Sequence, residues 1–398
     1  MKFENVFVPY RSYWSTPFCR WQGSLAGERP LKLAAVCAAK SLAKSGCAAA
    51  RLQGIHFGMT VPQAQSFYGA PWLAALVDPD HITGPTISQA CATSARVLAS
   101  AAAAVETKSS NLVMAAAADR ISNGPHIYYP DPSAPGGLGE SENWVWDNFN
   151  QDPHAKVAMV QTAENVAAKF DISRAEQDAL TLRRYEQYQM ARADDCAFQS
   201  GYIQKVDLKS RHGPTTLSED EGIVETTREG IEKLKPVIEG GSVTYATQTH
   251  PADGNAGMLL AGPDEAKDLS DESNVQIQLL AFGEGRAEKA HMGMAPVPAA
   301  QAALAAVELT MDDIAVVKTH NPFAVNDIYF SRQMNFGAED MNNYGSSLIY
   351  GHPQGPTGLR LVIEMIEELV MTGGGNGLFT GCAAGDTGAA IVVKVDIA

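Results

Sequence analysis

Three side chains suited to nucleophilic and acid–base chemistry lie in stretches of small residues: Cys91, His352 and Cys382. Cys91 lies in QACATSAR, between a short β-type run and an alanine-rich helical pattern at 94–108. A helix N-terminus carries partial positive charge and unpaired N–H groups, which favour a thiolate over a thiol. The placement therefore predicts a nucleophilic Cys91. The alternative is a small buried residue, which most cysteines are.

His352 lies in GHPQGPTGLR, where glycine and proline flank it on an expected strand-to-helix turn. Backbone of this kind can hold an imidazole as a general base or an oxyanion donor, although a lone histidine on a turn is commonly an ordinary polar residue. Cys382 lies in FTGCAAGD, which we expect to be a Gly/Ala turn. Two thiols and one imidazole fit acyl transfer combined with carbon–carbon bond chemistry. One thiol would attack a carbonyl, and the other would move a proton at carbon.

Other polar residues are open to more than one interpretation. His320 and Asn321 end an expected strand, where active sites of α/β proteins gather, but they also fit an ordinary polar strand end. Asn326 and Asp327 could cap a helix. The glycines of TGGGNG (372–377) follow a helix and precede a strand, so they predict a turn and not a phosphate loop. The pair Arg183 and Arg184 predicts a solvated helix face.

Composition narrows the classes of protein. The chain has 398 residues and a formal net charge of −15, which predicts two or three units and argues against nucleic acid as a partner. Six cysteines without a CxxC pair argue against a zinc site within the chain, so we expect free thiols and no metal. We expect no signal peptide and no membrane span, and hence a cytoplasmic protein.

The order of elements predicts an α/β layer fold. Helix and strand patterns alternate in 1–120 and return in 244–398, which favours a duplicated α/β unit. The intervening segment 121–243 reads as an insertion with helices at 156–170 and 174–198, the second capped by Asp171 or Ser173.

Taken in order along the chain, these stretches resemble the thiolase family over nearly its full length. QACATSAR is similar to the thiolase nucleophile motif, and GHPQGPTGLR and GCAAGD are similar to the histidine and second-cysteine motifs. Residues 159–203 resemble the helices of the thiolase covering domain, TTREGIEKLKPVIEGGSVT resembles the return from it, and MGMAPVPAAQAAL resembles the motif before the second half.

The resemblance implies a five-layer αβαβα core of two similar halves with a covering loop domain. We expect the halves at 1–120 (with 244–268) and 269–398, and the covering domain at 121–243. It also implies CoA-dependent cleavage of a 3-oxoacyl-CoA, or the reverse Claisen condensation, by a homodimer or dimer of dimers. CoA would be a co-substrate and acyl-CoA a ligand, with no permanently bound cofactor.

The resemblance assigns roles to individual residues. His352 would take the proton of Cys91, which attacks the 3-keto carbon, and Cys382 would protonate the departing enolate carbon and then deprotonate CoA. One oxyanion hole would be formed by the N–H groups of Cys91 and Ala384, the latter commonly glycine in thiolases. The other would lie at His352 with a water beside His320. The expected CoA contacts are Thr249, Met292, Phe323 and His352.

Two departures from the family pattern stand out. HNPF (320–323) replaces the Asn-Glu-Ala-Phe of many thiolases, so His320 takes the place of the water-holding asparagine, as in sterol-carrier-type and some archaeal-type thiolases, and Asn321 replaces an acidic residue. THPADGNAG (249–257) replaces a Ser-Gly pantetheine contact, where Thr249 could supply the hydroxyl and His250 could narrow or contact the acyl site.

Some thiolases with this histidine work with a small zinc-ribbon/OB-fold subunit. HNPFAVND and WSTPFCRWQGS suggest the large subunit of a benzoylsuccinyl-CoA-type thiolase, which forms benzoyl-CoA and succinyl-CoA. The aromatic loops 66–73 and 144–149 could wall an aromatic acyl pocket, or belong to an interface or the core. Two alternatives are a carbon–carbon lyase or condensing enzyme of the same fold, and a non-catalytic acyl-CoA-binding subunit.

Overall fold

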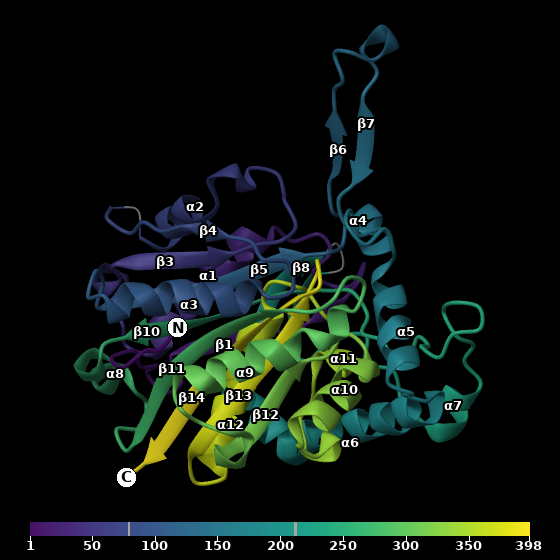
Figure 1. The fold of residues 1–398 in the computed structure, drawn as a ribbon. Coiled ribbons are helices and arrows are strands. Elements are labelled where there is room, and N and C mark those ends of the chain that lie inside the picture. The colour runs from purple at the N-terminus through teal and green to yellow at the C-terminus, as the bar shows by residue number, and fades with distance from the viewer. Residues whose placement is uncertain (79, 211–212) are drawn as a thin grey trace.

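Two sheets form the frame of the computed structural model, which describes residues 1–78, 80–210 and 213–398 (Figure 1). The first sheet has the order β1-β10-β5-β3-β4, with β2 also paired to β10, and the second has the order β11-β14-β13-β12. The strands of the first sheet are β1 (Tyr13–Ser15), β2 (Cys19–Arg20), β3 (Gly54–Gly58), β4 (Thr86–Ile87), β5 (Leu112–Arg120) and β10 (Ala252–Ala261). The strands of the second are β11 (Val275–Arg286), β12 (Ile314–His320), β13 (Gly375–Ala383) and β14 (Thr387–Ile397).

Helices cover both outer faces and fill the space between the sheets. Helices α3 (Thr93–Glu106) and α12 (Thr357–Met371) share one apolar cluster with residues of both sheets, so they form the central layer. The outer face of the first sheet packs on α1 (Pro30–Lys44), α2 (Gly69–Val77) and α8 (Pro263–Leu269). The outer face of the second packs on α9 (Pro296–Ala306) and α10 (Ala324–Met334). The five-layer α/β architecture expected from the sequence is therefore confirmed.

Small residues allow these layers to approach closely. Strand β5 reads LVMAAAADR and is buried along all but its last residue, as expected for a strand covered on both faces. A Cβ added at Gly283 of β11 would lie 2.4 Å from the carbonyl oxygen of Ala299 in α9, so the helix backbone rests directly on this strand. The alanine-rich pattern thus fixes a short distance between layers.

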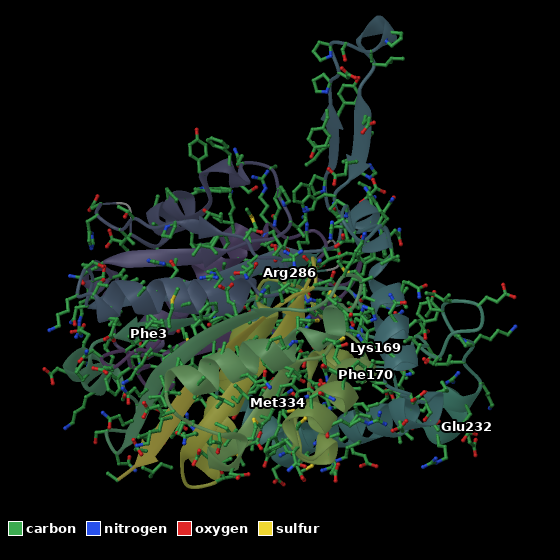
Figure 2. All side chains as sticks on the ribbon, viewed as in Figure 1. Phe3, Lys169, Phe170, Glu232, Arg286 and Met334 are labelled. Carbon is green, nitrogen blue, oxygen red and sulfur yellow. The ribbon has the colours of Figure 1, made fainter. Side chains whose placement is uncertain are left out.

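The segment between the halves extends away from the layers. The hairpin of β6 (His126–Tyr129) and β7 (Glu140–Asn143) projects from the body (Figure 1). The following elements are α4 (Trp146–Asn150), α5 (Met159–Lys169), α6 (Arg174–Ser200), β8 (Val206–Ser210), β9 (Gly213–Leu217) and α7 (Arg228–Glu232). Phe170, just after α5 and labelled in Figure 2, packs on Tyr329 of α10 with ring centroids 4.7 Å apart. The segment is thereby anchored on the second half.

Helix α6 can be compared with what the sequence predicted for it. Ser173 is the cap, because its hydroxyl accepts from the N–H of Glu176 and the two residues form a capping box. The helix is broken near its end, where Asp194 to Cys196 adopt left-handed conformations. The solvated face predicted at Arg184 is wrong, because its side chain is fully buried. Its guanidinium donates from Nε and Nη2 to Oδ2 of Asp327, 143 residues away.

No helix in the described part of the chain has both the length and the apolar character needed to cross a membrane.

Candidate active site

The four residues predicted to take part in catalysis lie at or near the ends of helices and strands. Cys91 lies between β4 and α3, directly after Ala90, whose φ is 45°. His320 is the last residue of β12, as expected. His352 follows the short helix α11 (Ser347–Tyr350), not a strand, and bridges Pro251 before α12 begins. Cys382 lies within β13, one residue before its end, so the turn predicted there begins only after Ala383.

Cys91, His320 and His352 meet in one buried cluster. One side-chain N or S atom from each lies within 4.8 Å of the others. The two imidazole centroids are 3.9 Å apart, with 31° between the ring planes. Cys91 is 8% exposed, His352 7% and His320 1%. Segments more than two hundred residues apart in the sequence therefore bring a thiol and two imidazoles together.

Hydroxyl groups orient both imidazoles. Nδ1 of His352 lies 2.7 Å from Oγ1 of Thr357, and Nδ1 of His320 lies 3.2 Å from Oγ of Ser347. The Nε2 atoms of both rings are buried and have no hydrogen-bond partner among the described residues. Because Nδ1 is occupied in each ring, Nε2 is the nitrogen that remains available for proton transfer or for hydrogen bonding to a ligand.

Burial governs the protonation of this cluster. It raises the pKa of the Cys91 thiol to about 12, although the N–H groups of Ala384 and of Cys91 itself act in the opposite direction. It also lowers the pKa of His320 to about 3, and that of His352 well below its ordinary value, where the neighbouring His320 contributes further. Desolvation of the charged form therefore opposes the thiolate that the helix N-terminus was expected to favour.

Cys382 contacts an amide that the sequence did not single out for this purpose. Nδ2 of Asn326 lies 3.2 Å from Sγ of Cys382 and donates to it. Burial raises the pKa of Cys382 well above its usual range, and the Cys91 thiol raises it further while the Asn326 hydrogen bond lowers it. The two thiols are thus close enough to influence each other's ionisation. Of the two interpretations left open by the sequence, the helix cap is wrong for Asn326, which lies within α10 and donates to the thiol.

A buried network supports the end of β12. Oδ1 of Asn321 accepts from the hydroxyl of Ser347, and Nδ2 of Asn321 donates to Asp327 and to Ser346. Asp327, also within α10 and not a cap, accepts from Arg184 as well. Asn321, which replaces an acidic residue of the family pattern, therefore holds Ser347, the hydroxyl that orients His320.

A second buried carboxylate joins the segment after His352 to the segment after β3. Asp119, at the end of β5, accepts from the N–H groups of Thr60 and Gly355, and burial raises its pKa to about 7. Gly355 follows His352 by three residues, and its carbonyl accepts from the hydroxyl of Ser94 in α3. Sequence reasoning passed over Asp119 because nothing local distinguishes it from a polar strand end.

The expected CoA contacts surround the same region. Thr249 donates its hydroxyl to the carbonyl oxygen of Ser347, and its N–H donates to Pro322. Met292 and Phe323 are buried. The carbonyl of His250 accepts from the N–H of His352, and Nε2 of His250 is buried without a partner among the described residues. Contact of Thr249, Met292 and Phe323 with CoA remains a prediction.

The aromatic side chains of the two loops differ in how far they are exposed. Phe67 is 95% exposed and Tyr68 66% exposed, and their rings pack edge to face on each other. Trp144 and Phe149 pack on a small cluster around Val61 and Ile121. In the single chain, the Phe67 and Tyr68 side chains therefore lie in solvent, whereas Trp144 and Phe149 are partly buried against this cluster.

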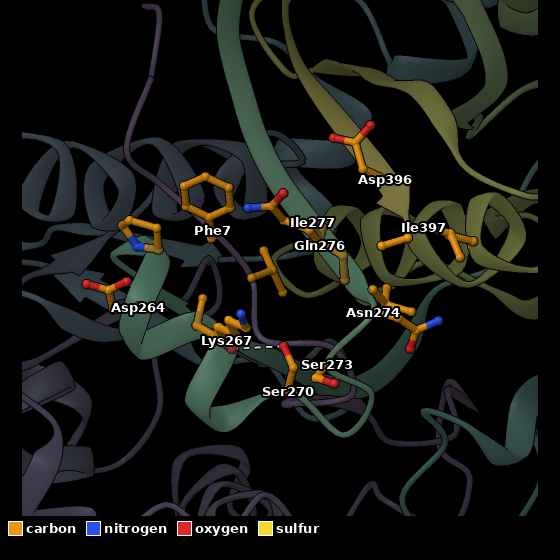
Figure 3. A pocket seen from close by; sticks show the side chains of 15 residues that line it. Phe7, Asp264, Lys267, Ser270, Ser273, Asn274, Gln276, Ile277, Asp396 and Ile397 are labelled. Carbon is orange, nitrogen blue, oxygen red and sulfur yellow. Dashed lines mark hydrogen bonds between the residues drawn. The ribbon is translucent and has the colours of Figure 1, made fainter.

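A separate surface hollow lies at the other end of the second sheet (Figure 3). Its volume is about 330 Å³, and its lining includes Phe7, Lys267, Gln276 and Asp396. The register pairs Val275 with Ile397 there and Ala383 with Thr387 near the thiols, so the length of β14 separates this hollow from the cluster.

Comparison with known proteins identifies the family. The thiolase N-terminal domain matches residues 12–264, and the thiolase C-terminal domain matches residues 274–395. The chain belongs to the thiolase family. This membership makes it an acyltransferase of that family, with 3-oxoacyl-CoA thiolase or acetyltransferase activity.

Similar proteins match this chain over nearly its full length and over nearly the full length of their own chains. The β-ketoadipyl-CoA thiolase of Pseudomonas knackmussii is 29% identical over 392 residues, covering 95% of this chain and 96% of its own. An acetyl-CoA acetyltransferase of Syntrophomonas wolfei is 26% identical, with coverage of 95% and 96%. The crystal structure of the Bacillus anthracis acetyl-CoA acetyltransferase superposes with a TM-score of 0.90 at 24% identity and 99% coverage of both chains. Human mitochondrial 3-ketoacyl-CoA thiolase gives 0.89 at 24% identity and 98% coverage of both chains. The fold is thus the thiolase fold.

Proposed function

We propose that this thiolase cleaves a 3-oxoacyl-CoA with CoA, or runs the reverse Claisen condensation, through an acyl thioester on Cys91. The observation that carries the proposal is the meeting of the Cys91 thiol with the His352 and His320 imidazoles within 4.8 Å, in a buried cluster. Cys382 lies beside it as a second thiol with its own hydrogen-bond donor.

In the first step, Nε2 of His352 accepts the proton of Cys91 while Sγ attacks the 3-keto carbon. Burial disfavours both the thiolate and the imidazolium, so in this mechanism proton transfer accompanies the attack and needs no preformed ion pair. Negative charge then develops on the keto oxygen. We assign its stabilisation to the N–H groups of Cys91 and Ala384, which act on Sγ in the free protein. One such donor contributes roughly 3–4 kcal/mol to a transition state.

The second step breaks the carbon–carbon bond. The leaving enolate carbon takes the proton of Cys382, and Asn326 stabilises the thiolate left behind. His352, now carrying the proton from Cys91, can donate from Nε2 to the enolate thioester oxygen, together with His320 or a water beside it. The Cys382 thiolate then deprotonates CoA, whose thiolate attacks the Cys91 thioester. Cys91 leaves as a thiolate, regains its proton from His352, and the shortened acyl-CoA is released.

The proposal also names a specific substrate. We propose benzoylsuccinyl-CoA, cleaved to benzoyl-CoA and succinyl-CoA, with a small zinc-ribbon/OB-fold subunit bound to a homodimer or dimer of dimers. Support comes from His320 in the asparagine position and from relatives named for β-ketoadipyl-CoA, whose acyl group, like benzoylsuccinyl, carries a second carboxylate. The chain should then cleave benzoylsuccinyl-CoA faster than acetoacetyl-CoA, and the opposite order would contradict this finer assignment alone.

One assay tests the reaction class. The protein is incubated with a panel of 3-oxoacyl-CoAs, with and without CoA and with and without the small subunit, and intact mass reports acylation of Cys91. Cleavage that requires CoA supports thiolysis. Cleavage without CoA would instead identify a carbon–carbon lyase, and tight binding without cleavage would identify a non-catalytic subunit.

Two variants separate the thiols. We expect Cys91→Ser to abolish acyl-enzyme formation, whereas Cys382→Ser should still accept an acyl group from an activated acyl-CoA. The partly exposed Cys196, replaced by serine, is the matched control. Equal acylation of wild type and Cys91→Ser would overturn the role of Cys91.

A further inference from the structure

We propose that Cys91, His320 and His352 together bind one zinc ion, or another borderline-soft divalent cation, and that the bound metal blocks the thiol. This inference goes beyond thiolysis and does not depend on it, because metal binding needs neither CoA nor substrate. It concerns the reactive cluster itself and not a structural zinc site of the CxxC type.

The donor set and its spacing carry the inference. Zinc is bound by thiolate sulfur and imidazole nitrogen at about 2.0–2.3 Å in tetrahedral geometry, which places ligand atoms about 3.3–3.7 Å apart. The three donors here already lie within 4.8 Å of one another. Closing the remaining gap requires each pair to approach by at most roughly 1–1.5 Å. The two ring planes, 31° apart, must also turn so that their Nε2 lone pairs point to one ion. A fourth position stays open for water.

One nitrogen of each ring is free for such a ligand. Nε2 of His320 and Nε2 of His352 are buried and unpartnered in the described part of the chain, which is costly unless something binds them. Their Nδ1 atoms are held by the hydroxyls of Ser347 and Thr357. Metal-binding histidines are oriented in the same way, with the second ring nitrogen bonded to a neighbouring group.

Metal binding releases one proton. Only the thiol must ionise: Cys91–SH and Zn²⁺ give a Cys91–S–Zn⁺ bond and one proton released to solvent. The metal withdraws electron density from the sulfur and covers one side of it, so a metal-bound Cys91 is a weaker nucleophile than a free thiolate.

His320 stands where many thiolases have asparagine. The third metal donor is therefore present only because this chain has the HNPF sequence at 320–323. An asparagine amide is a poor zinc ligand beside imidazole, so His320→Asn removes one strong donor. Loss of groups that only support a ligand weakens metal binding by 10–100-fold, so loss of the ligand itself should cost at least about 100-fold.

Equilibrium dialysis against ZnCl₂ tests the site on the full chain. We expect one high-affinity zinc per chain in the wild type and in Cys196→Ser, and binding at least about 100-fold weaker in His320→Asn and in Cys91→Ser. Circular dichroism checks that each variant is folded. Unchanged zinc affinity in folded His320→Asn or Cys91→Ser would overturn the proposal.

A second measurement uses only the wild type. One equivalent of Zn²⁺ should suppress iodoacetamide labelling of Cys91, Mg²⁺ should not, and EDTA should restore the labelling. Co²⁺ in the same site should give a thiolate-to-metal charge-transfer absorption band. Unchanged labelling of Cys91 in the presence of zinc would refute the site even if the variants failed to fold, and it would leave the thiolysis proposal standing.

Discussion

Replacing Thr357 with valine should slow formation of the acyl-enzyme. The Thr357 hydroxyl is the only described hydrogen-bond partner of the His352 ring, at 2.7 Å from Nδ1, and Thr357 is fully buried at the start of α12. Valine keeps the shape of threonine but removes the hydroxyl. Nδ1 of His352 then has no partner, and the ring loses the contact that directs Nε2 toward Cys91.

The magnitude follows from the burial of this hydrogen bond. A buried polar atom that loses its partner costs about 1–3 kcal/mol. If that cost falls on the reactive orientation of His352, kcat/KM drops by roughly 5- to 150-fold, because 1.4 kcal/mol corresponds to a factor of ten. The Thr357 hydroxyl is buried against the His352 ring and is not among the expected CoA contacts. The loss should therefore appear in kcat and in the rate of Cys91 acylation, with little change in KM.

Rapid mixing with mass detection of the Cys91 thioester gives that rate directly. Thr357→Ser retains the hydroxyl and is the matched control, and we expect it to acylate within a few-fold of the wild-type rate. A wild-type acylation rate in Thr357→Val would refute the positioning role. An equal loss in Thr357→Ser and Thr357→Val would assign the effect to packing of α12 instead.

Two further predictions test the burial of charge. Arg184→Met leaves the Asp327 carboxylate buried without its cation, which should lower the free energy of unfolding by about 3–5 kcal/mol in urea titrations. The neighbouring Arg183→Met, whose partly exposed side chain pairs with Glu186, should change it by no more than about 1 kcal/mol, and similar losses in both variants would contradict the assignment. Iodoacetamide labelling of Cys91 should rise about tenfold for each pH unit between pH 7 and 9, because a pKa of about 12 keeps the thiolate fraction small and proportional to hydroxide. A labelling rate that levels off near neutral pH would reveal a thiolate–imidazolium pair in the free protein.

Helices and strands with a clear hydrophobic pattern were predictable from the sequence. The alanine-rich α3 and the apolar β5 were found close to their observed bounds, because hydrophobic periodicity is a local signal. Strand β10 was missed, since ADGNAGMLLA begins with polar residues and glycine. In the fold, Asn255 accepts from Trp14 Nε1 and Asp253 accepts from the N–H of Ser122, so tertiary hydrogen bonds make this polar strand stable inside the sheet.

The reactive residues were predictable, but their supports were not. Cys91, His320 and His352 were selected by residue type and motif, and the structure brings them together. Thr357 carried a weak signal as a hydroxyl at a helix start, five residues after His352. Asn326 carried none, because its contact with Cys382 joins α10 to β13 across 56 positions.

The amino-acid sequence alone determined the kind of chemistry, the α/β class and the order of the elements, because residue type and local periodicity are encoded within short windows. The tertiary structure alone decided the protonation of the thiol and the imidazoles, the partners that orient each ring, and the burial of Arg184. These depend on desolvation and on contacts between segments far apart in the chain, and no local pattern reports the number of water molecules that folding removes from a side chain.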